Sequence, residues 1–234
     1  MDAVRAIDVI AEVVRDARPG ETPARLCAVA EKLLPIVGAS VSLRSSGMPI
    51  RLAASNSLAS YLAGVQTTLG DGPWLHAYRT GAPVLACDLA GGRDMRRWPL
   101  FARQATAVGV RAVYSMPLGS DDGLTVGTLD LYRDGPGDLT EDELRRAQLL
   151  AAVMTLALTT LPREESGGGE EAWLGGLAAE HDEVYQAIGM VMAQLGVAAD
   201  EASARLRARA FAQGRAVLEV AHDVISHRER LDGD

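Results

Sequence analysis

The stretch that decides the fold of the first half of the chain is VYSMPLGSDDGLTVGTLDLY, residues 113–132. Residues 113–118 and 126–132 are rich in the β-branched, aromatic and aliphatic side chains that favour strands. Between them, the turn residues Asp121-Asp122-Gly123 allow the chain to reverse. The stretch therefore predicts a β-hairpin, and with it an antiparallel sheet.

The segments on both sides of this hairpin alternate between helical and strand patterns. A second hairpin is predicted at residues 41–43 and 50–52, and a short strand at 83–86. Apolar residues recur at helical spacing over residues 4–14, and the capping box Thr140-Glu141-Asp142-Glu143 predicts the start of another helix. The order of helices, hairpin, helices, hairpin and helix predicts an α+β fold in which helices pack on an antiparallel sheet.

The helix that starts at this capping box carries apolar residues spaced alternately by three and four, which is a heptad seam. Two interpretations stay open, because such a seam could pack on the helix's own sheet or form a dimer interface. Leu149, Leu150 and Val153 are apolar too, which leaves one apolar side for the sheet and one for a partner. We expect a homodimer. The seam consists of Leu144, Ala147, Ala151, Met154, Leu158 and Leu161.

A change of composition divides the chain in two. Pro162 ends the preceding helix, and the run Gly167-Gly168-Gly169 cannot hold a helix. We expect a first domain over residues 1–162, a flexible Gly/Glu linker over 163–172 and a second domain over 173–234. Apolar residues at helical spacing predict three helices, and no strand, for the second domain.

Composition and charge exclude several classes of protein. With 31 acidic and 23 basic residues the net charge is −8, which excludes a general nucleic-acid coat protein but not a small local site. The aromatic content of 4% disfavours folds that stack RNA bases on several rings. Cys27 and Cys87 are too few for a disulfide scaffold or a cysteine-based zinc finger. With no targeting segment and no bilayer-length apolar run, we expect a cytoplasmic protein without a membrane partner.

Both parts of the chain carry motifs of known families. QAIGMVMAQLGV at 186–197 and the residues that follow, up to Val224, resemble the ANTAR domain. LGDGP at 69–73 and GTLDLYR at 127–133 resemble parts of a GAF domain. Together the two parts resemble the actinobacterial GAF–ANTAR regulators over nearly the whole chain.

This resemblance implies a signalling protein without a cofactor rather than an enzyme. ANTAR domains bind RNA stem-loops near terminators, typically as dimers, and act in transcription antitermination. GAF domains sense small molecules or mediate dimerisation. One departure from the family is Ile188, since many ANTAR domains carry a basic residue there and isoleucine cannot contact a phosphate.

Arginines concentrate between residues 205 and 215, where four of them occur. Arg205 and Arg209 lie four residues apart on one helical face, whereas Arg207 points elsewhere. Arg205 is equally suited to an ion pair with Glu201 one turn earlier. Three phosphate contacts per protomer, doubled in a dimer, predict a salt slope of about −4 for single-stranded RNA. With the motif residue Gln186 and the family positions 207 and 215, the candidate RNA-binding residues are Gln186, Arg205, Arg207, Arg209 and Arg215.

A ligand pocket in the first domain is the second candidate site. Trp74, His76, Tyr114 and Met116 are suited to line it, with Asp88 at its mouth, although Trp74 and Tyr114 are more typical of a core. Haem ligation by His76 has little support, and the spacing of cysteine and histidine predicts no metal site.

Three other functions stay open. The second domain could be a protein-interaction module that no longer binds RNA, which Ile188 and the acidic total favour. The first domain could be an enzyme that uses Asp88 or Asp130, although no nucleophile–base motif accompanies them. A DNA-binding helix-turn-helix with its turn near Gly214-Arg215 lacks a basic recognition helix.

Overall fold

The computed structural model describes residues 3–15, 17, 19–45, 48–119, 124–159 and 171–231. Contacts divide the chain into two compact units, which are treated separately below. The first comprises Met1–Gln66 and Asp71–Gly167, and the second includes Gly168–Asp234. Within the described residues, none of the helices is long and apolar enough to cross a membrane.

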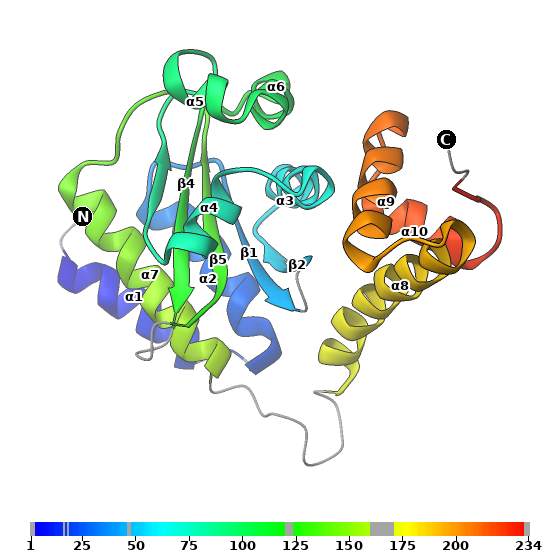
Figure 1. Ribbon diagram of the computed structural model, residues 1–234. Helices are drawn as coiled ribbons and strands as arrows, with labels where there is room; N and C mark the ends of the chain where they lie inside the picture. Colours follow the sequence, from blue (N-terminus) through cyan, green and yellow to red (C-terminus); the bar gives the residue numbers. More distant parts are fainter. Residues whose placement is uncertain are drawn as a thin grey trace. The chain divides into compact units, whose positions relative to one another are not determined.

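The first unit confirms the predicted α+β architecture, with helices around an antiparallel sheet (Figure 1). Its elements in chain order are α1 (Ala3–Arg15), α2 (Thr22–Leu33), β1 (Gly38–Ser45), β2 (Met48–Ala54), α3 (Ser57–Leu69), α4 (Pro73–Thr80), β3 (Val84–Ala86), α5 (Gly92–Arg97), α6 (Pro99–Ala107), β4 (Ala112–Gly119), β5 (Thr125–Arg133) and α7 (Glu141–Thr159).

The sheet has the strand order β2-β1-β5-β4-β3, and each neighbouring pair is antiparallel. Both predicted hairpins, β1–β2 and β4–β5, are confirmed, and they join through the pairing of β1 with β5. In this register Asp130 lies between Ser40 and Ser115. Gly127 is required at the β1–β5 contact, because a Cβ atom there would lie within 2.3 Å of the carbonyl oxygen of Ser42.

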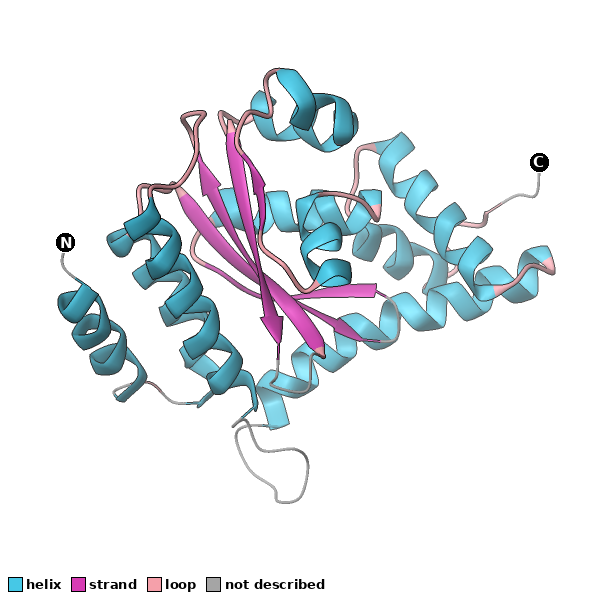
Figure 2. Ribbon diagram, turned by 60° about the vertical axis from the view of Figure 1, so that its left-hand side comes forward, coloured by secondary structure: helices cyan, strands magenta, loops and turns pink. Residues whose placement is uncertain are grey.

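Helices cover both faces of the sheet (Figure 2). One face is apolar, with Val41, Met116, Leu129 and Leu131 buried, and α2 and α7 pack on this side, with α1 against them. The other face carries Asp130 and faces α3 and α4. Because successive side chains of a strand point to opposite faces, the apolar and the polar layer alternate along β4 and β5.

Helix α7 begins at the predicted capping box. The backbone N–H of Thr140 donates to Glu143 Oε2 at 2.8 Å, and the N–H of Glu143 donates to Thr140 Oγ1 at 3.3 Å. The heptad seam, however, faces the helix's own unit, since Ala147, Ala151 and Met154 are buried where α7 packs against β4 and α2. These seam residues therefore do not form a dimer interface, because the sheet already covers them. The last seam residue, 161, lies outside the described residues.

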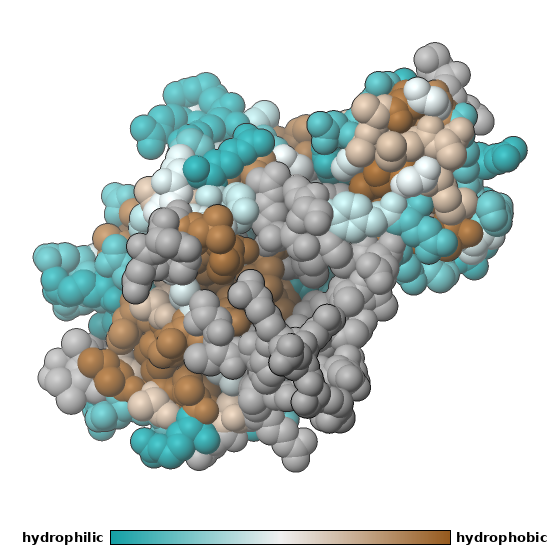
Figure 3. All heavy atoms as spheres, turned by 60° about the horizontal axis from the view of Figure 1, so that its bottom comes forward, coloured by the Kyte–Doolittle hydropathy of each residue, from teal (hydrophilic) through white to brown (hydrophobic). Residues whose placement is uncertain are grey.

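A different apolar strip of α7 faces away from the sheet. Leu156 is 63% exposed, and the neighbouring Val153 is half-buried. On α1, which packs against α7, Ile7 is 52% and Val14 is 38% exposed. Figure 3 shows hydrophobic side chains gathered over this part of the first unit.

In the described part of the second unit, α8 (Glu171–Leu195), α9 (Ala199–Gln213) and α10 (Val217–Ile225) form the predicted helical bundle. Gly196 and Gly214 follow the ends of α8 and α9 with φ of +67° and +64°, a conformation that suits glycine. Most of the predicted linker lies outside the described residues, and α8 already begins at residue 171. The core residues are Val184, Ala187, Ile188, Val191, Ala202, Leu206, Ala210, Val217, Val220, Ala221 and Val224.

Candidate functional site

The arginines of α9 lie on more than one face, as their spacing predicts. Arg205 donates from Nε and Nη2 to Glu201 Oε1 at 3.1 and 2.8 Å. This is the pairing one turn apart that the sequence offered as an alternative to RNA contact. Arg205 therefore already has an acidic partner on its own helix.

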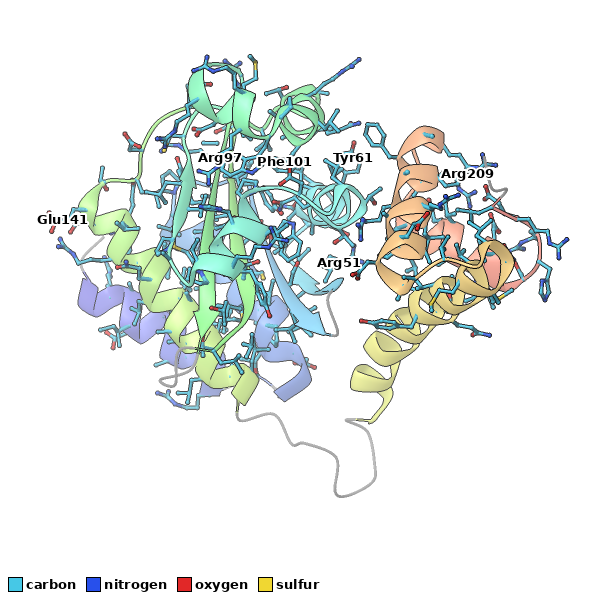
Figure 4. All side chains as sticks on the ribbon, viewed as in Figure 1. Arg51, Tyr61, Arg97, Phe101, Glu141 and Arg209 are labelled. Carbon is cyan, nitrogen blue, oxygen red and sulfur yellow. The ribbon has the colours of Figure 1, made fainter. Side chains whose placement is uncertain are left out.

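Glu229, after α10, binds side chains from the end of α9. Arg209 Nε donates to its Oε1 at 2.5 Å and Gln213 Nε2 donates to the same oxygen at 2.7 Å. Arg215 Nη1 lies 3.5 Å from its Oε2. The Glu229 side chain is only 10% exposed, so these donors hold a largely desolvated carboxylate. Arg209 is labelled in Figure 4.

Asp223 of α10 forms the second half of this network. It accepts a hydrogen bond from Arg215 Nη2 at 2.6 Å and forms an ion pair with Arg228 Nε at 2.8 Å. The hydrogen bond to Arg215 lowers the pKa of Asp223, and the same bond raises the pKa of Arg215. The predicted RNA-binding Arg209 and Arg215 therefore also hold α9, α10 and the following segment together.

Arg207 differs from these arginines in its partner. Its Nη1 donates to the hydroxyl of Ser203 at 2.8 Å, a neutral group one turn earlier. One turn later on the same face is Phe211, an aromatic residue that is 42% exposed. Phe211 is not among the candidate RNA-binding residues that the sequence predicts, and the signal that identifies it is its helical spacing from Arg207.

The remaining two ANTAR-motif positions lie on opposite sides of α8. Gln186 is exposed, as an RNA-contacting residue must be. Ile188 is 6% exposed and belongs to the bundle core with Ala187 and Val191. The isoleucine therefore contributes packing at this position.

The predicted ligand-pocket residues do not come together. Trp74 of α4 is buried, and its backbone N–H donates to Gln66 Oε1 at 3.3 Å, whereas its indole Nε1 finds no hydrogen-bond partner among the described residues. His76 Nε2 lies 2.7 Å from Nη2 of Arg97, which also stacks 4.7 Å from the ring centroid of Trp98.

Two further pocket residues are also bound elsewhere. Asp88 lies in the loop after β3, where its Oδ1 accepts a hydrogen bond from the backbone N–H of Ala90 at 3.0 Å. The hydroxyl of Tyr114 donates to the carbonyl of Gly137 at 2.6 Å, on the sheet face opposite to Ser115 and α4. The sheet therefore separates Tyr114 from Trp74.

A buried polar cluster lies on the α3 side of the sheet instead. Asp130 is fully buried, and its carboxyl accepts hydrogen bonds from Ser115 at 2.5 Å and from Gln66 and Thr128 at 3.5 Å each. These donors are neutral, and burial raises the pKa of Asp130 to about 7. Gln66 links this carboxyl to the backbone of Trp74, so the cluster connects the sheet with α3 and α4.

The surroundings of the Asp130 carboxyl and of the Cys87 thiol do not suit catalysis. Asp130 is 1% exposed and therefore has no access to a substrate in solution. Cys87 Sγ donates to Asp138 Oδ1 at 2.8 Å, and burial with this bond raises the pKa of the thiol to about 12, so it is a poor nucleophile. Across the described residues, no three His, Cys, Asp or Glu side chains gather into a potential metal site.

Comparisons with known families agree with this architecture. The GAF domain model matches residues 16–159, and the ANTAR domain model matches residues 177–225. No match to the chain was found among curated protein sequences. GAF and ANTAR domains are signalling and regulatory domains rather than catalytic ones.

Solved structures show the same fold in the first unit. The GAF domain of a phosphoenolpyruvate-protein phosphotransferase from Coxiella burnetii is 14% identical, with 68% of this chain and 95% of that chain covered at a TM-score of 0.52. A GAF domain region from Geobacter sulfurreducens is 14% identical, with 65% and 99% covered at 0.52. The free methionine-R-sulfoxide reductase from Neisseria meningitidis is 18% identical, with 66% and 86% covered at 0.51. At these identities the likeness establishes the fold alone.

A GAF domain followed by an ANTAR domain is the arrangement found in signal-sensing regulators of transcription antitermination. The GAF model alone accounts for more than half of the chain, and the ANTAR model covers the helical unit behind it. The chain therefore belongs to the GAF family and is a GAF–ANTAR regulator.

Proposed function

We propose that the chain is a dimeric cytoplasmic regulator that binds RNA stem-loops near terminators through its second unit, in response to a signal received by its first unit. The observation that carries this proposal is an ANTAR-family bundle whose α9 places the half-buried Arg207 and the exposed Phe211 on one helical face. An arginine fork suits phosphate, and an exposed ring suits a base of an RNA loop.

The other candidate residues fit an interface around this face. Gln186 is exposed on α8, and Arg205, Arg209 and Arg215 keep donor groups that a phosphate could share with their acidic partners. A guanidinium has five N–H donors, so a single carboxylate does not exhaust it. RNA would therefore compete with these carboxylates rather than meet free cations.

We further propose that the exposed strip of α7, together with α1, forms the dimer interface. Leu156 at 63% and Ile7 at 52% exposure are large apolar side chains on two neighbouring helices. Burying such a strip against a second copy removes apolar surface from water. A signal that changes the population of the dimer would then change how two ANTAR units are presented to paired stem-loops.

One specific observation favours a second function, a protein-interaction module without RNA binding. Arg205, Arg209 and Arg215 each bind an acidic side chain of the same unit. In this alternative the arginines stabilise the bundle and the exposed face binds another protein.

Binding of a fluorescein-labelled terminator-proximal hairpin, followed by anisotropy, tests the proposal. We expect Arg207→Gln and Phe211→Ala each to weaken binding by about tenfold, since a base stacked on an aromatic ring contributes about 1–3 kcal/mol. The logarithm of affinity should fall with the logarithm of salt at a slope of about −4.

The matched control is Arg145→Gln, which removes one exposed arginine of α7 that pairs with Glu141 and Asp142. It should leave hairpin affinity unchanged. If no hairpin, including RNA recovered by crosslinking from cells, binds the wild-type chain at low salt, the interaction module replaces the RNA-binding proposal.

A further inference from the structure

A surface groove separates helices α5 and α6 of the first unit from the loop after β3. Its volume is about 730 Å³, within the range of sites that hold small molecules. Leu89, Met95, Pro99 and Ala102 supply apolar walls, and the side chains of Arg96 and Arg103 line it from α5 and α6. None of the predicted pocket residues lines this α5–α6 groove. Figure 4 labels Arg97 and Phe101 on these two helices.

Helices α5 and α6, which line the groove, are held on the unit by buried and hydrogen-bonded side chains. Phe101 of α6 is 1% exposed and Trp98, between the two helices, is 4% exposed. Tyr61 of α3 donates from its hydroxyl to Gln104 of α6 at 3.0 Å. The groove therefore lies on a packed support rather than on a loose loop.

The charge of this segment is opposite to that of the chain. Between residues 89 and 111 there are five arginines and one aspartate, Asp94, whereas the whole chain carries −8. Asp94 Oδ2 accepts the backbone N–H groups of Cys87 and Asp88 at 2.8 and 3.2 Å, and Asp88 in turn accepts that of Ala90. The carboxylates of Asp94 and Asp88 are thus engaged by the loop backbone.

Arg96 and Arg103 differ in this respect from the other arginines of the segment. Arg97 is held by His76 and by the ring of Trp98. In the described part of the chain, neither Arg96 nor Arg103 pairs with a carboxylate. Two guanidinium groups at one apolar hollow are therefore left without an anionic partner among the described residues.

We propose that the α5–α6 groove binds a small organic anion, a molecule with an apolar body and a carboxylate or phosphate group. The apolar walls would cover the body, and Arg96 and Arg103 would hold the anionic group by charge-assisted hydrogen bonds. A hollow with apolar walls suits such a molecule better than an RNA backbone, which needs an open basic surface. The role of this ligand as the signal rests on the proposed function, whereas its binding does not.

Calorimetric titration of the full chain with four probes tests the proposal. 1-Naphthoate and 1-naphthyl phosphate combine an apolar body with the two anionic groups, and the tighter of them identifies the preferred group. 1-Naphthol lacks the charge and inorganic phosphate lacks the body. We expect saturable binding of at least one naphthyl anion, and binding at least about tenfold weaker for 1-naphthol and for phosphate.

Variants locate the binding. Arg96→Gln and Arg103→Gln should each weaken binding of the preferred naphthyl anion by about tenfold, and the double variant should lose saturable binding. Arg93→Gln is the matched control, because Arg93 lies on α5 with a side chain 82% exposed and does not line the groove. It should change the affinity by less than about twofold. These exposed substitutions should not alter the fold, which circular dichroism checks.

Binding that persists in the double variant, or that is equally strong for 1-naphthol, would overturn the proposal. Loss of hairpin affinity in the double variant without ligand would overturn it as well, because the arginines would then be an RNA contact. If the wild-type chain binds a naphthyl anion at this groove but no hairpin, the proposed RNA-binding function fails and the ligand site stands.

Discussion

Charged side chains have opposite surroundings in the two units of this protein. In the second unit Arg205, Arg209 and Arg215 each meet an acidic side chain within 2.8 Å. In the first unit Asp130 is buried among neutral donors, and within the described residues Arg96 and Arg103 of the α5–α6 groove pair with no carboxylate. A cluster of arginines in a sequence therefore does not show how many of them are unpaired, because that depends on the carboxylates that the fold brings to them.

The largest expected effect comes from Asp130→Asn, which keeps a hydrogen-bonding side chain but removes the buried acid. Burial raises the pKa of Asp130 to about 7, against about 3.9 in an unfolded chain. The stability that the protonated Asp130 carboxyl contributes is fully present below about pH 4. It is lost as the pH rises through 7, because this carboxyl loses its proton at a lower pH in the unfolded chain than in the folded one. At pH 8 we expect the variant to be more stable than the wild type by on the order of 3 kcal/mol.

Urea unfolding followed by tryptophan fluorescence at pH 5 and pH 8 measures this difference, since Trp74 and Trp98 are buried in this unit. The gain should shrink strongly at pH 5. Asp142→Asn removes an exposed acid of α7 that pairs with Arg145, and should show no such gain at pH 8. Equal stability of Asp130→Asn and wild type at pH 8 would contradict the contrast between the units.

A second experiment frees arginines in the second unit. Glu229→Gln removes the charge that Arg209 and Arg215 share, and should lower the free energy of unfolding by about 1–3 kcal/mol. If the acid competes with phosphate, hairpin affinity at low salt should rise severalfold in the same variant. Asp142→Asn, which removes an exposed acid of α7 in the first unit, controls for the loss of any negative charge. A fall in stability without a gain in RNA affinity would assign these arginines to the bundle alone.

The smallest expected effect is that of Arg205→Gln. The pair with Glu201 lies on the surface one helical turn apart, where such pairs contribute about 0.3–0.5 kcal/mol. We expect the thermal midpoint to shift only slightly and hairpin affinity to fall by about twofold. A tenfold loss of affinity in anisotropy would instead place Arg205 among the principal RNA contacts.

The sequence predicts the elements of this fold well where patterns are long. Both hairpins and the helices of the second unit follow their periodicity. Helices α4 and α5 are not predicted from the sequence because they have eight and six residues, too few for an apolar pattern to separate a helix from a loop. The seam of α7 has the spacing of a dimer interface, but the same spacing serves a helix packed on its own sheet.

The candidate sites were predicted less well, and for physical reasons. The pairing of Arg209 with Glu229, twenty residues later, depends on how α9 packs near the end of the bundle. Tyr114 and Trp74 lie on opposite faces of the sheet, which alternation along β4 could have shown. Arg96 and Arg103 become neighbours of one groove only when α5 folds back against α6.

The spacing between the two units sets a physical limit on the second. Helix α7 ends at Thr159 and α8 begins at Glu171, so the eleven residues between them reach at most about 40 Å even when fully extended. The first residue of α8 can therefore lie no farther than this from the last residue of its own α7. In the proposed dimer along α7, both ANTAR units would begin within that reach of one interface, so that a second stem-loop of the same RNA would meet the second unit at a raised local concentration.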